Sequence, residues 1–302
     1  SANPYRGCFH GCSYCYARPT HHYIDFGAGA DFERKIVVKT NAAELLEAAF
    51  MKPSWVGERI VFSGVTDCYQ PLERSYEITK RCLEVCLRFR NPVSIITKGA
   101  LVARDAELLG ALAREADAEV FVSLAFADDA TARTVEPHTP SPRARLRAMK
   151  TLHEAGVRVG LALAPMIPGL NDTEIPELVA RAKEAGASRA FMTLLRLPAE
   201  VEGIFFEQLE QNLPSRSNKI RHAIMAMKDG ALNRASFGKR MVGSGARWDA
   251  VQWLFESACR KHQIEVGERR MDGGEVRGAT FERPTAQLEL FEKKCGENTI
   301  DS

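Results

Sequence analysis

The sequence lacks most of the features that assign a chain to a class at first sight. No apolar run approaches the roughly 20 residues that a membrane-spanning helix needs, and no signal peptide precedes the first motif. The net charge is only +2, and the eight cysteines form no paired framework of the kind found in secreted disulfide scaffolds. These absences predict a protein of the reducing cytoplasm, without a membrane partner, whose thiols are free to bind metal.

Three of the cysteines, Cys8, Cys12 and Cys15, occur close together in the run C-F-H-G-C-S-Y-C. Gaps of three and two residues allow one short loop to present three thiolates to a 4Fe-4S cluster, which leaves one iron without a protein ligand. Such an open iron can bind and cleave a small molecule. A zinc knuckle is the alternative, but zinc prefers four ligands and paired C-x-x-C elements, and the sequence contains no second pair.

This cysteine spacing, with Tyr14 directly before the third cysteine, resembles the signature of radical S-adenosyl-L-methionine (SAM) enzymes. The resemblance implies that Cys8, Cys12 and Cys15 hold a 4Fe-4S cluster and that SAM chelates its fourth iron. It also implies that an electron from an external donor cleaves SAM to methionine and a 5′-deoxyadenosyl radical.

After the cysteine motif, short β-branched runs alternate with amphipathic helical stretches. The strand candidates are almost continuously apolar, as expected when both faces of a parallel sheet are covered. With a short strand at residues 2–5, they predict an α/β fold, a partial (β/α)6 barrel whose active groups lie at the carboxyl ends of the strands. The other predicted strands span residues 59–65, 92–98, 119–126, 158–165 and 188–196, and the helices 42–50, 74–90, 105–115, 142–155 and 174–185.

Beyond Pro198 the alternation ends and mainly helical segments follow. We therefore divide the chain into a barrel (1–198), a helical and basic C-terminal extension (199–283) and a flexible tail (284–302) with little capacity to pack. The helices predicted in the extension span residues 203–213, 217–228 and 248–262.

Four further stretches resemble the spore photoproduct lyase family of DNA-repair radical SAM enzymes: C-S-Y-C-Y (12–16), I-I-T-K (95–98), V-S-L (122–124) and the run E-P-H-T-P to L-A-L-A-P (136–165). The resemblance implies that Lys98 and Ser123 contact SAM, since an ammonium neutralises a carboxylate at short range. A surface lysine at a strand end is the alternative for Lys98. Tyr14 belongs to the same predicted cofactor site, and the small residues Gly64 and Ala164 allow the cofactor to approach closely.

In that family a tyrosine after the third cluster cysteine takes part in a hydrogen-atom relay with a further cysteine. Tyr16 occupies the position of the tyrosine, whereas Gly64 occupies that of the relay cysteine, and Cys68 lies four residues later. We predict that Tyr16 and Cys68 are catalytic, because a weak S–H bond makes a thiol a good hydrogen donor. The alternative for Cys68 is a small, buried hydrophobic side chain. The departure also leaves open whether thymine-dimer reversal is the reaction.

Residues 216–247 contain eight Lys and Arg and a single acid, Asp229. The Gly-rich part of this segment falls where the lyase family carries a basic hairpin that contacts the lesion in DNA. Lys239, Arg240 and Arg247 are therefore predicted to contact phosphates. A solvated helix face and loop is the alternative for this local charge.

The tail contains A-Q-L-E-L-F (286–291). Its residues Gln287, Leu288, Leu290 and Phe291 resemble the peptide with which bacterial polymerases and repair proteins bind the DNA sliding clamp. Such an extended peptide places Leu and Phe in apolar pockets while Gln forms a polar anchor. The sequence therefore predicts a bacterial sliding clamp as a partner; the alternative is that these apolar side chains fold back onto the core.

These features predict a radical SAM enzyme that acts on nucleic acid, and on DNA in particular. Two alternatives stay open at this point. One is a radical SAM enzyme that modifies RNA, a protein or a small metabolite. The other is a clamp-associated iron–sulfur sensor without catalytic activity.

Overall fold

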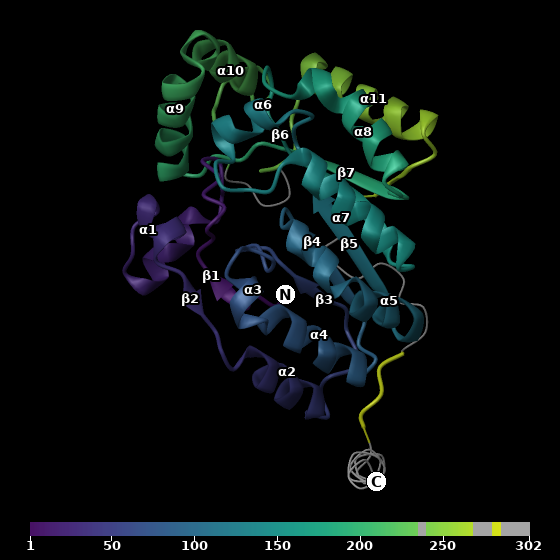
Figure 1. The fold of residues 1–302 in the computed structure, drawn as a ribbon. Coiled ribbons are helices and arrows are strands. Elements are labelled where there is room, and N and C mark those ends of the chain that lie inside the picture. The colour runs from purple at the N-terminus through teal and green to yellow at the C-terminus, as the bar shows by residue number, and fades with distance from the viewer. Residues whose placement is uncertain (235–239, 268–279, 285–302) are drawn as a thin grey trace, which may run out of the picture.

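The computed structural model describes residues 1–234, 240–267 and 280–284. Within these residues one sheet contains six parallel strands, and their order in space follows the chain (Figure 1). Parallel neighbours need a crossover between each pair, so the predicted partial β/α barrel is confirmed. The strands are β3 (Ile60–Phe62), β4 (Val93–Thr97), β5 (Ala118–Ser123), β6 (Arg158–Met166), β7 (Arg189–Leu194) and β8 (Glu265–Val266).

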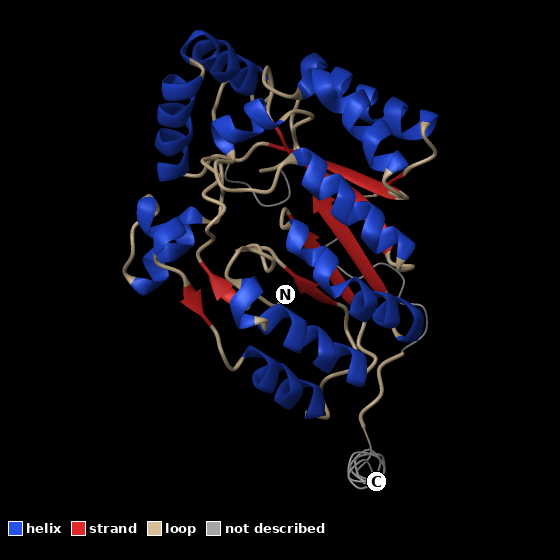
Figure 2. Ribbon diagram, in the orientation of Figure 1, coloured by secondary structure: helices blue, strands red, loops and turns tan. Residues whose placement is uncertain are grey.

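The crossovers carry helices that follow one another along the outer face of the sheet (Figure 2). In α4 the buried side chains of Ile78, Cys82 and Cys86 recur every four residues, so this pair of cysteines packs against the barrel. The helix α7 begins at Pro142, and the Ser141 side chain caps it by accepting the Ala144 N–H. The main helices of this layer are α2 (Ala42–Met51), α4 (Ile78–Arg88), α5 (Ala106–Glu115), α7 (Pro142–Glu154) and α8 (Ile175–Glu184).

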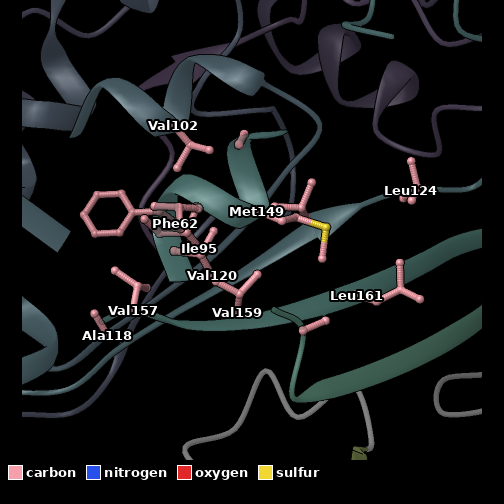
Figure 3. Close-up of a cluster of buried hydrophobic side chains, with 14 of the residues drawn as sticks. Phe62, Ile95, Val102, Ala118, Val120, Leu124, Met149, Val157, Val159 and Leu161 are labelled. Carbon is pink, nitrogen blue, oxygen red and sulfur yellow. The ribbon is translucent and has the colours of Figure 1, made fainter. Parts of the chain in front are cut away.

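The main core lies between the sheet and these helices. One row of paired residues crosses four neighbouring strands, and each of its side chains is almost fully buried: Phe62, Ile95, Val120 and Val159 (Figure 3). Val102, from the 3-10 helix η2 (Ala100–Asp105), and Met149 of α7 belong to the same cluster. Burying a side chain of this size contributes about 1.5–3 kcal/mol, so this row fixes the register of the strands.

The amino terminus differs from the prediction of a strand at residues 2–5. Ala2 forms a single parallel bridge to Phe62, after which β1 (Tyr5–Arg6) pairs antiparallel with β2 (Val37–Val38). Pro4 has no N–H with which to continue a ladder, which explains the interruption. The sixth strand of the sheet is instead β8, which follows α11 near the end of the described residues and pairs with β7.

The helix predicted at residues 74–90 is divided into α3 (Glu73–Tyr76) and α4. Glu77 adopts a left-handed conformation with φ +48°, which ends the first helix. The buried carboxylate of Glu73 accepts the backbone N–H groups of Thr79 and Lys80, so it caps the second helix across the break.

The helices beyond Pro198 pack in two places. The helices α9 (Glu200–Asn212) and α10 (Pro214–Ala226) form a second apolar cluster with α6 (Asp129–Val135) and the cysteine motif. The helix α11 (Ala246–Lys261) instead lies beside α8 (Figure 1), and β8 follows it in the chain. No helix in the described part of the chain is both long and apolar enough to cross a bilayer.

Candidate active site

The three cysteines lie in a loop between β1 and the 3-10 helix η1 (Arg18–Ile24), which we call the cysteine loop (residues 7–17). Gly7 turns the chain with φ +86°, and a Cβ there would lie 2.8 Å from the carbonyl oxygen of Phe32. The backbone N–H of Cys8 donates to that same oxygen at 2.9 Å, and the N–H of Cys15 donates to Cys12 O at 3.2 Å. Only glycine permits this close approach, so the loop depends on Gly7 for its shape.

The thiols of Cys8, Cys12 and Cys15 line one cavity. Cys8 and Cys12 are buried and Cys15 is partly exposed. Burial raises the pKa of each thiol, and burial together with Glu136 raises that of Cys12 to about 12. Iron binding therefore has to displace protons from these thiols.

The three thiols are soft donors of the kind that hold iron–sulfur clusters. Among the described residues, no group of three or more His, Cys, Asp or Glu side chains is placed to hold one metal ion. A 4Fe-4S cube needs a wider arrangement, because each cysteine ligates a different iron. Three soft thiol donors that line one cavity match the number of protein ligands that leaves one iron of such a cube open.

The remaining predicted cofactor-binding residues reach the same cavity from the carboxyl ends of successive strands. Gly64 follows β3, Lys98 follows β4, Ser123 ends β5, and Ala164 lies near the end of β6. Tyr14 and Tyr16 of the cysteine loop also line it. The structure thus brings together every predicted cluster and cofactor residue at one edge of the sheet.

Lys98 occupies a charged and enclosed position in this cavity. Its Nζ lies 5.7 Å from the centre of the Tyr14 ring, within cation–π range. Burial alone would lower the pKa of Lys98, but Glu136 and Cys12 raise it above its ordinary value. Lys98 therefore presents a charged ammonium to the cavity, unlike the surface lysine considered as the alternative.

Cys68 is not brought to this cavity. Its side chain is 1% exposed in the main core, and its Sγ lies 3.9 Å from the carbonyl oxygen of Phe62. The neighbouring Asp67 lines the cavity, so the chain turns the Cys68 side chain the other way. The structure therefore favours the packing alternative for Cys68 over the relay.

Three charged residues beside the cavity were not predicted as site residues: Asp67, Glu136 and Arg145. Asp67 lines the cavity, while Glu136 and Arg145 are buried directly behind Tyr14. Glu136 and Arg145 fall within the run at 136–165 that resembles the lyase family, but the sequence does not show which of its charged side chains the fold encloses.

Of the predicted nucleic-acid contacts, Arg240 and Arg247 are described, whereas Lys239 lies outside the described residues. Met241, next to Arg240, lines the cavity, and its carbonyl oxygen accepts the N–H of Leu194 at 2.9 Å. Arg247 is 3.5 Å from Asp172, an acid outside the basic segment, so part of the local charge is neutralised. The predicted clamp-binding residues Gln287, Leu288, Leu290 and Phe291 also lie outside the described residues.

Residues 2–182 match the radical SAM superfamily, a span that contains the cysteine loop and strands β3 to β6. The chain belongs to the radical SAM superfamily of enzymes. This radical SAM chain is 36% identical over 223 residues to the uncharacterized protein Mb2609c of Mycobacterium bovis, covering 73% of this chain and 66% of the relative. It thus spans just under two thirds of that relative's length. The uncharacterized protein MJ0683 of Methanocaldococcus jannaschii is 31% identical over 212 residues, covering 70% and 75% of the two chains.

Among solved structures, this radical SAM chain resembles spore photoproduct lyase. A variant of that enzyme with bound SAM and dinucleoside spore photoproduct superimposes with a TM-score of 0.61 at 16% identity, covering 87% of this chain and 74% of the lyase. A complex of the lyase with the dinucleoside photoproduct gives 0.60 with the same coverage. At this identity the likeness concerns the fold, which the two proteins share over most of their length.

Proposed function

We propose that this radical SAM enzyme cleaves SAM at a 4Fe-4S cluster held by Cys8, Cys12 and Cys15 and acts on DNA. The observation that carries the proposal is that the three thiols meet Lys98 and Ser123 in one cavity at the carboxyl edge of the sheet. When bound and reduced, the cofactors supply a 5′-deoxyadenosyl radical that removes a hydrogen atom from a base or lesion. The protein has to bind, orient and shield them, in the cytoplasm and with an external electron donor.

The strand-end residues are suited to bind SAM. The Lys98 ammonium would pair with the methionine carboxylate. The Ser123 hydroxyl donates to the carbonyl oxygen of Ala164 at 3.0 Å, so its own oxygen is left to accept a hydrogen bond from a ribose hydroxyl. Gly64 and Ala164 carry little or no side chain, which allows the adenosyl group to lie against the backbone.

The remaining wall of the cavity suits radical chemistry. Phe32, Phe191, Leu194 and Met241 supply apolar surface that excludes water from reactive species. We propose the Tyr16 hydroxyl for hydrogen transfer, because it lines the cavity and the Cys68 thiol is buried elsewhere. It would give a hydrogen atom to the substrate radical, and one electron from the external donor with a proton from solvent would restore the phenol.

The proposal of a DNA substrate rests on the basic rim of the cavity and on the family resemblance. Arg196 lines the cavity, and its guanidinium carbon lies 5.6 Å from the centre of the Tyr16 ring. Arg240 precedes Met241 at the cavity wall. The Arg196 guanidinium beside an apolar cavity suits a nucleotide whose base enters the cavity while its phosphates stay outside.

The test is the formation of 5′-deoxyadenosine by the reconstituted, reduced enzyme under anaerobic conditions. We expect DNA, whether ultraviolet-irradiated or undamaged, to stimulate 5′-deoxyadenosine formation. The Cys12→Ala substitution should abolish this reaction. Cys86→Ala is the matched control, because this thiol is fully buried between α4 and the core and should leave the reaction intact. Stimulation by RNA alone would contradict the DNA proposal, and an intact cluster that never cleaves SAM would favour the sensor alternative.

A sliding clamp remains part of the proposal, supported by the described residues that precede the tail. The Phe281 ring stacks on Phe89 at 6.2 Å, and Arg283 donates to the carbonyl oxygens of Phe50, Lys52 and Trp55. These partners precede β3 and β4, so residues 281–283 lie at the amino edge of the sheet (Figure 1). The residues that line the cavity lie at the opposite, carboxyl edge. A clamp bound to residues 286–291 would leave the cavity open.

A further inference from the structure

Two carboxylates connect the cysteine loop to the barrel: Asp67, whose side chain is 10% exposed, and Glu136, which is fully buried. The first is Asp67, which follows β3. It accepts the Thr97 hydroxyl at 2.5 Å and the backbone N–H of Lys98 at 2.6 Å, and it lies 3.5 Å from Nδ1 of His10. His10 stands between Cys8 and Cys12, so Asp67 joins that half of the loop to the end of β4.

The second carboxylate is Glu136, at the end of α6. It accepts hydrogen bonds from the Tyr14 hydroxyl and from the Arg145 guanidinium, and the hydroxyl of Thr139 lies 3.2 Å away. Tyr14 stands between Cys12 and Cys15, so Glu136 holds the other half of the loop. Arg145 is 1% exposed and also donates to the carbonyl oxygen of Ser123 at 3.0 Å, which connects the same pair to the end of β5.

Lys98 lies between the two connections. Its backbone is held by Asp67, and its ammonium faces the Tyr14 ring that Glu136 fixes. We propose that Asp67 and Glu136 are positioning residues that set the distance between the cluster cysteines and the SAM-binding groups Lys98 and Ser123. The proposal rests on the proposed function, in which the cluster and SAM bind in this cavity.

Energetics support a positioning role over incidental packing. A buried charge is costly unless it is paired, and both carboxylates are satisfied by several partners within the described chain. A satisfied network of charged hydrogen bonds in a low-dielectric interior is rigid, because any displacement leaves a charge without its partner. The loop and the strand ends must then move as one unit, which a chelated cofactor spanning both requires.

The sharpest test is Tyr14→Phe, which removes the phenol–carboxylate bond but leaves Glu136 paired with Arg145. Tyr69→Phe is the matched control: Tyr69 is also a buried tyrosine whose hydroxyl donates to a carboxylate, that of Asp105 at 3.1 Å, but it lies in the main core. The measurements are SAM affinity by equilibrium dialysis, iron content per chain, and the electron paramagnetic resonance spectrum of the reduced cluster with and without SAM. Asp67→Asn tests the other connection in the same way.

We expect Tyr14→Phe and Asp67→Asn to weaken SAM binding about fivefold to tenfold at wild-type iron content, and to alter the spectral change that SAM induces. Tyr69→Phe should match the wild type in all three measurements. Wild-type affinity and spectra in folded Tyr14→Phe and Asp67→Asn proteins would overturn the inference. A wild-type protein that assembles no cluster or binds no SAM would instead overturn the proposed function, so the two failures are distinguishable.

Discussion

The hydroxyl of Tyr16 donates a hydrogen bond to the carbonyl oxygen of Gly64 at 2.7 Å, although 48 residues separate them. The bond joins the cysteine loop to the end of β3 and holds the phenol at the cavity wall. By its sequence resemblance to the lyase family, Gly64 is expected at the position of that family's relay cysteine. The nearest later thiol, that of Cys68, points into the core. Of the two residues predicted to be catalytic, Tyr16 therefore lines the cavity and Cys68 does not.

The first prediction concerns Tyr16→Phe. Phenylalanine has no O–H to donate, so we expect product formation to fall at least tenfold while reductive cleavage of SAM continues. Losing one hydrogen bond costs about 1 kcal/mol, which should not unfold the protein. Product and 5′-deoxyadenosine are quantified from the same reaction, with Tyr23→Phe as a control because this side chain is 80% exposed. An unchanged ratio of product to 5′-deoxyadenosine would remove Tyr16 from hydrogen transfer.

The second prediction separates packing from catalysis at Cys68. Cys68→Ala empties a small volume in the core and should lower the free energy of unfolding by roughly 1–2 kcal/mol. Turnover and product identity should stay as in the wild type, because the thiol does not line the cavity. Denaturant unfolding and product analysis measure the two effects. A Cys68→Ala protein that loses turnover without losing stability would support a relay role for Cys68.

Much of the fold could be predicted because parallel strands covered on both faces are almost continuously apolar. The strands β3 to β7 have that pattern. The last strand, β8, has only two residues, both exposed, so no periodicity indicates it. The break at Glu77 involves a residue distant in sequence. The Glu73 carboxylate, which accepts N–H groups of α4 across the break, also accepts the hydroxyl of Tyr5, 68 residues earlier.

The site was predictable where a motif or a strand end identified it. The cysteine spacing identifies the three candidate cluster ligands, and the resemblance to the lyase family implies Lys98 and Ser123, both at strand ends. Asp67 and Glu136 could not be found in that way, because an isolated acid is usually a surface residue. Their role depends on burial beside a loop more than 50 residues earlier, which is a property of the folded chain alone.

The third prediction concerns Lys228, which is 1% exposed and donates to the carbonyl oxygen of Leu195 at 2.5 Å. Burial, with contributions from Arg234 and Arg196, lowers its pKa to about 8 from an ordinary value of 10.5. Between these values the unfolded chain binds more protons than the folded chain, so the Lys228 contribution to the free energy of unfolding rises with pH.

We therefore expect the wild type to gain stability relative to Lys228→Met from pH 8 to 10.5, by at most roughly 3 kcal/mol. Below pH 8 the difference between the two proteins should be constant. Lys219→Met is the control, because Lys219 is an exposed lysine on α10. Denaturant unfolding across this range is the measurement, and a flat difference for Lys228→Met would contradict the lowered pKa.

The last prediction concerns the tail. We expect the full chain to bind a bacterial sliding clamp with micromolar or tighter affinity in surface plasmon resonance. Leu290→Ala/Phe291→Ala should remove this binding, because these side chains are the apolar anchors of the motif. Phe281→Ala should leave the affinity nearly unchanged while it lowers stability, since Phe281 packs on Phe50 and Phe89 rather than belonging to the motif. Clamp addition should also leave 5′-deoxyadenosine formation intact, because residues 281–283, which precede the tail, lie at the edge of the sheet opposite the cavity. Clamp binding that the double substitution leaves unchanged would indicate that the apolar side chains of the tail pack against the core instead. RNA, protein and metabolite substrates would then be as open as DNA.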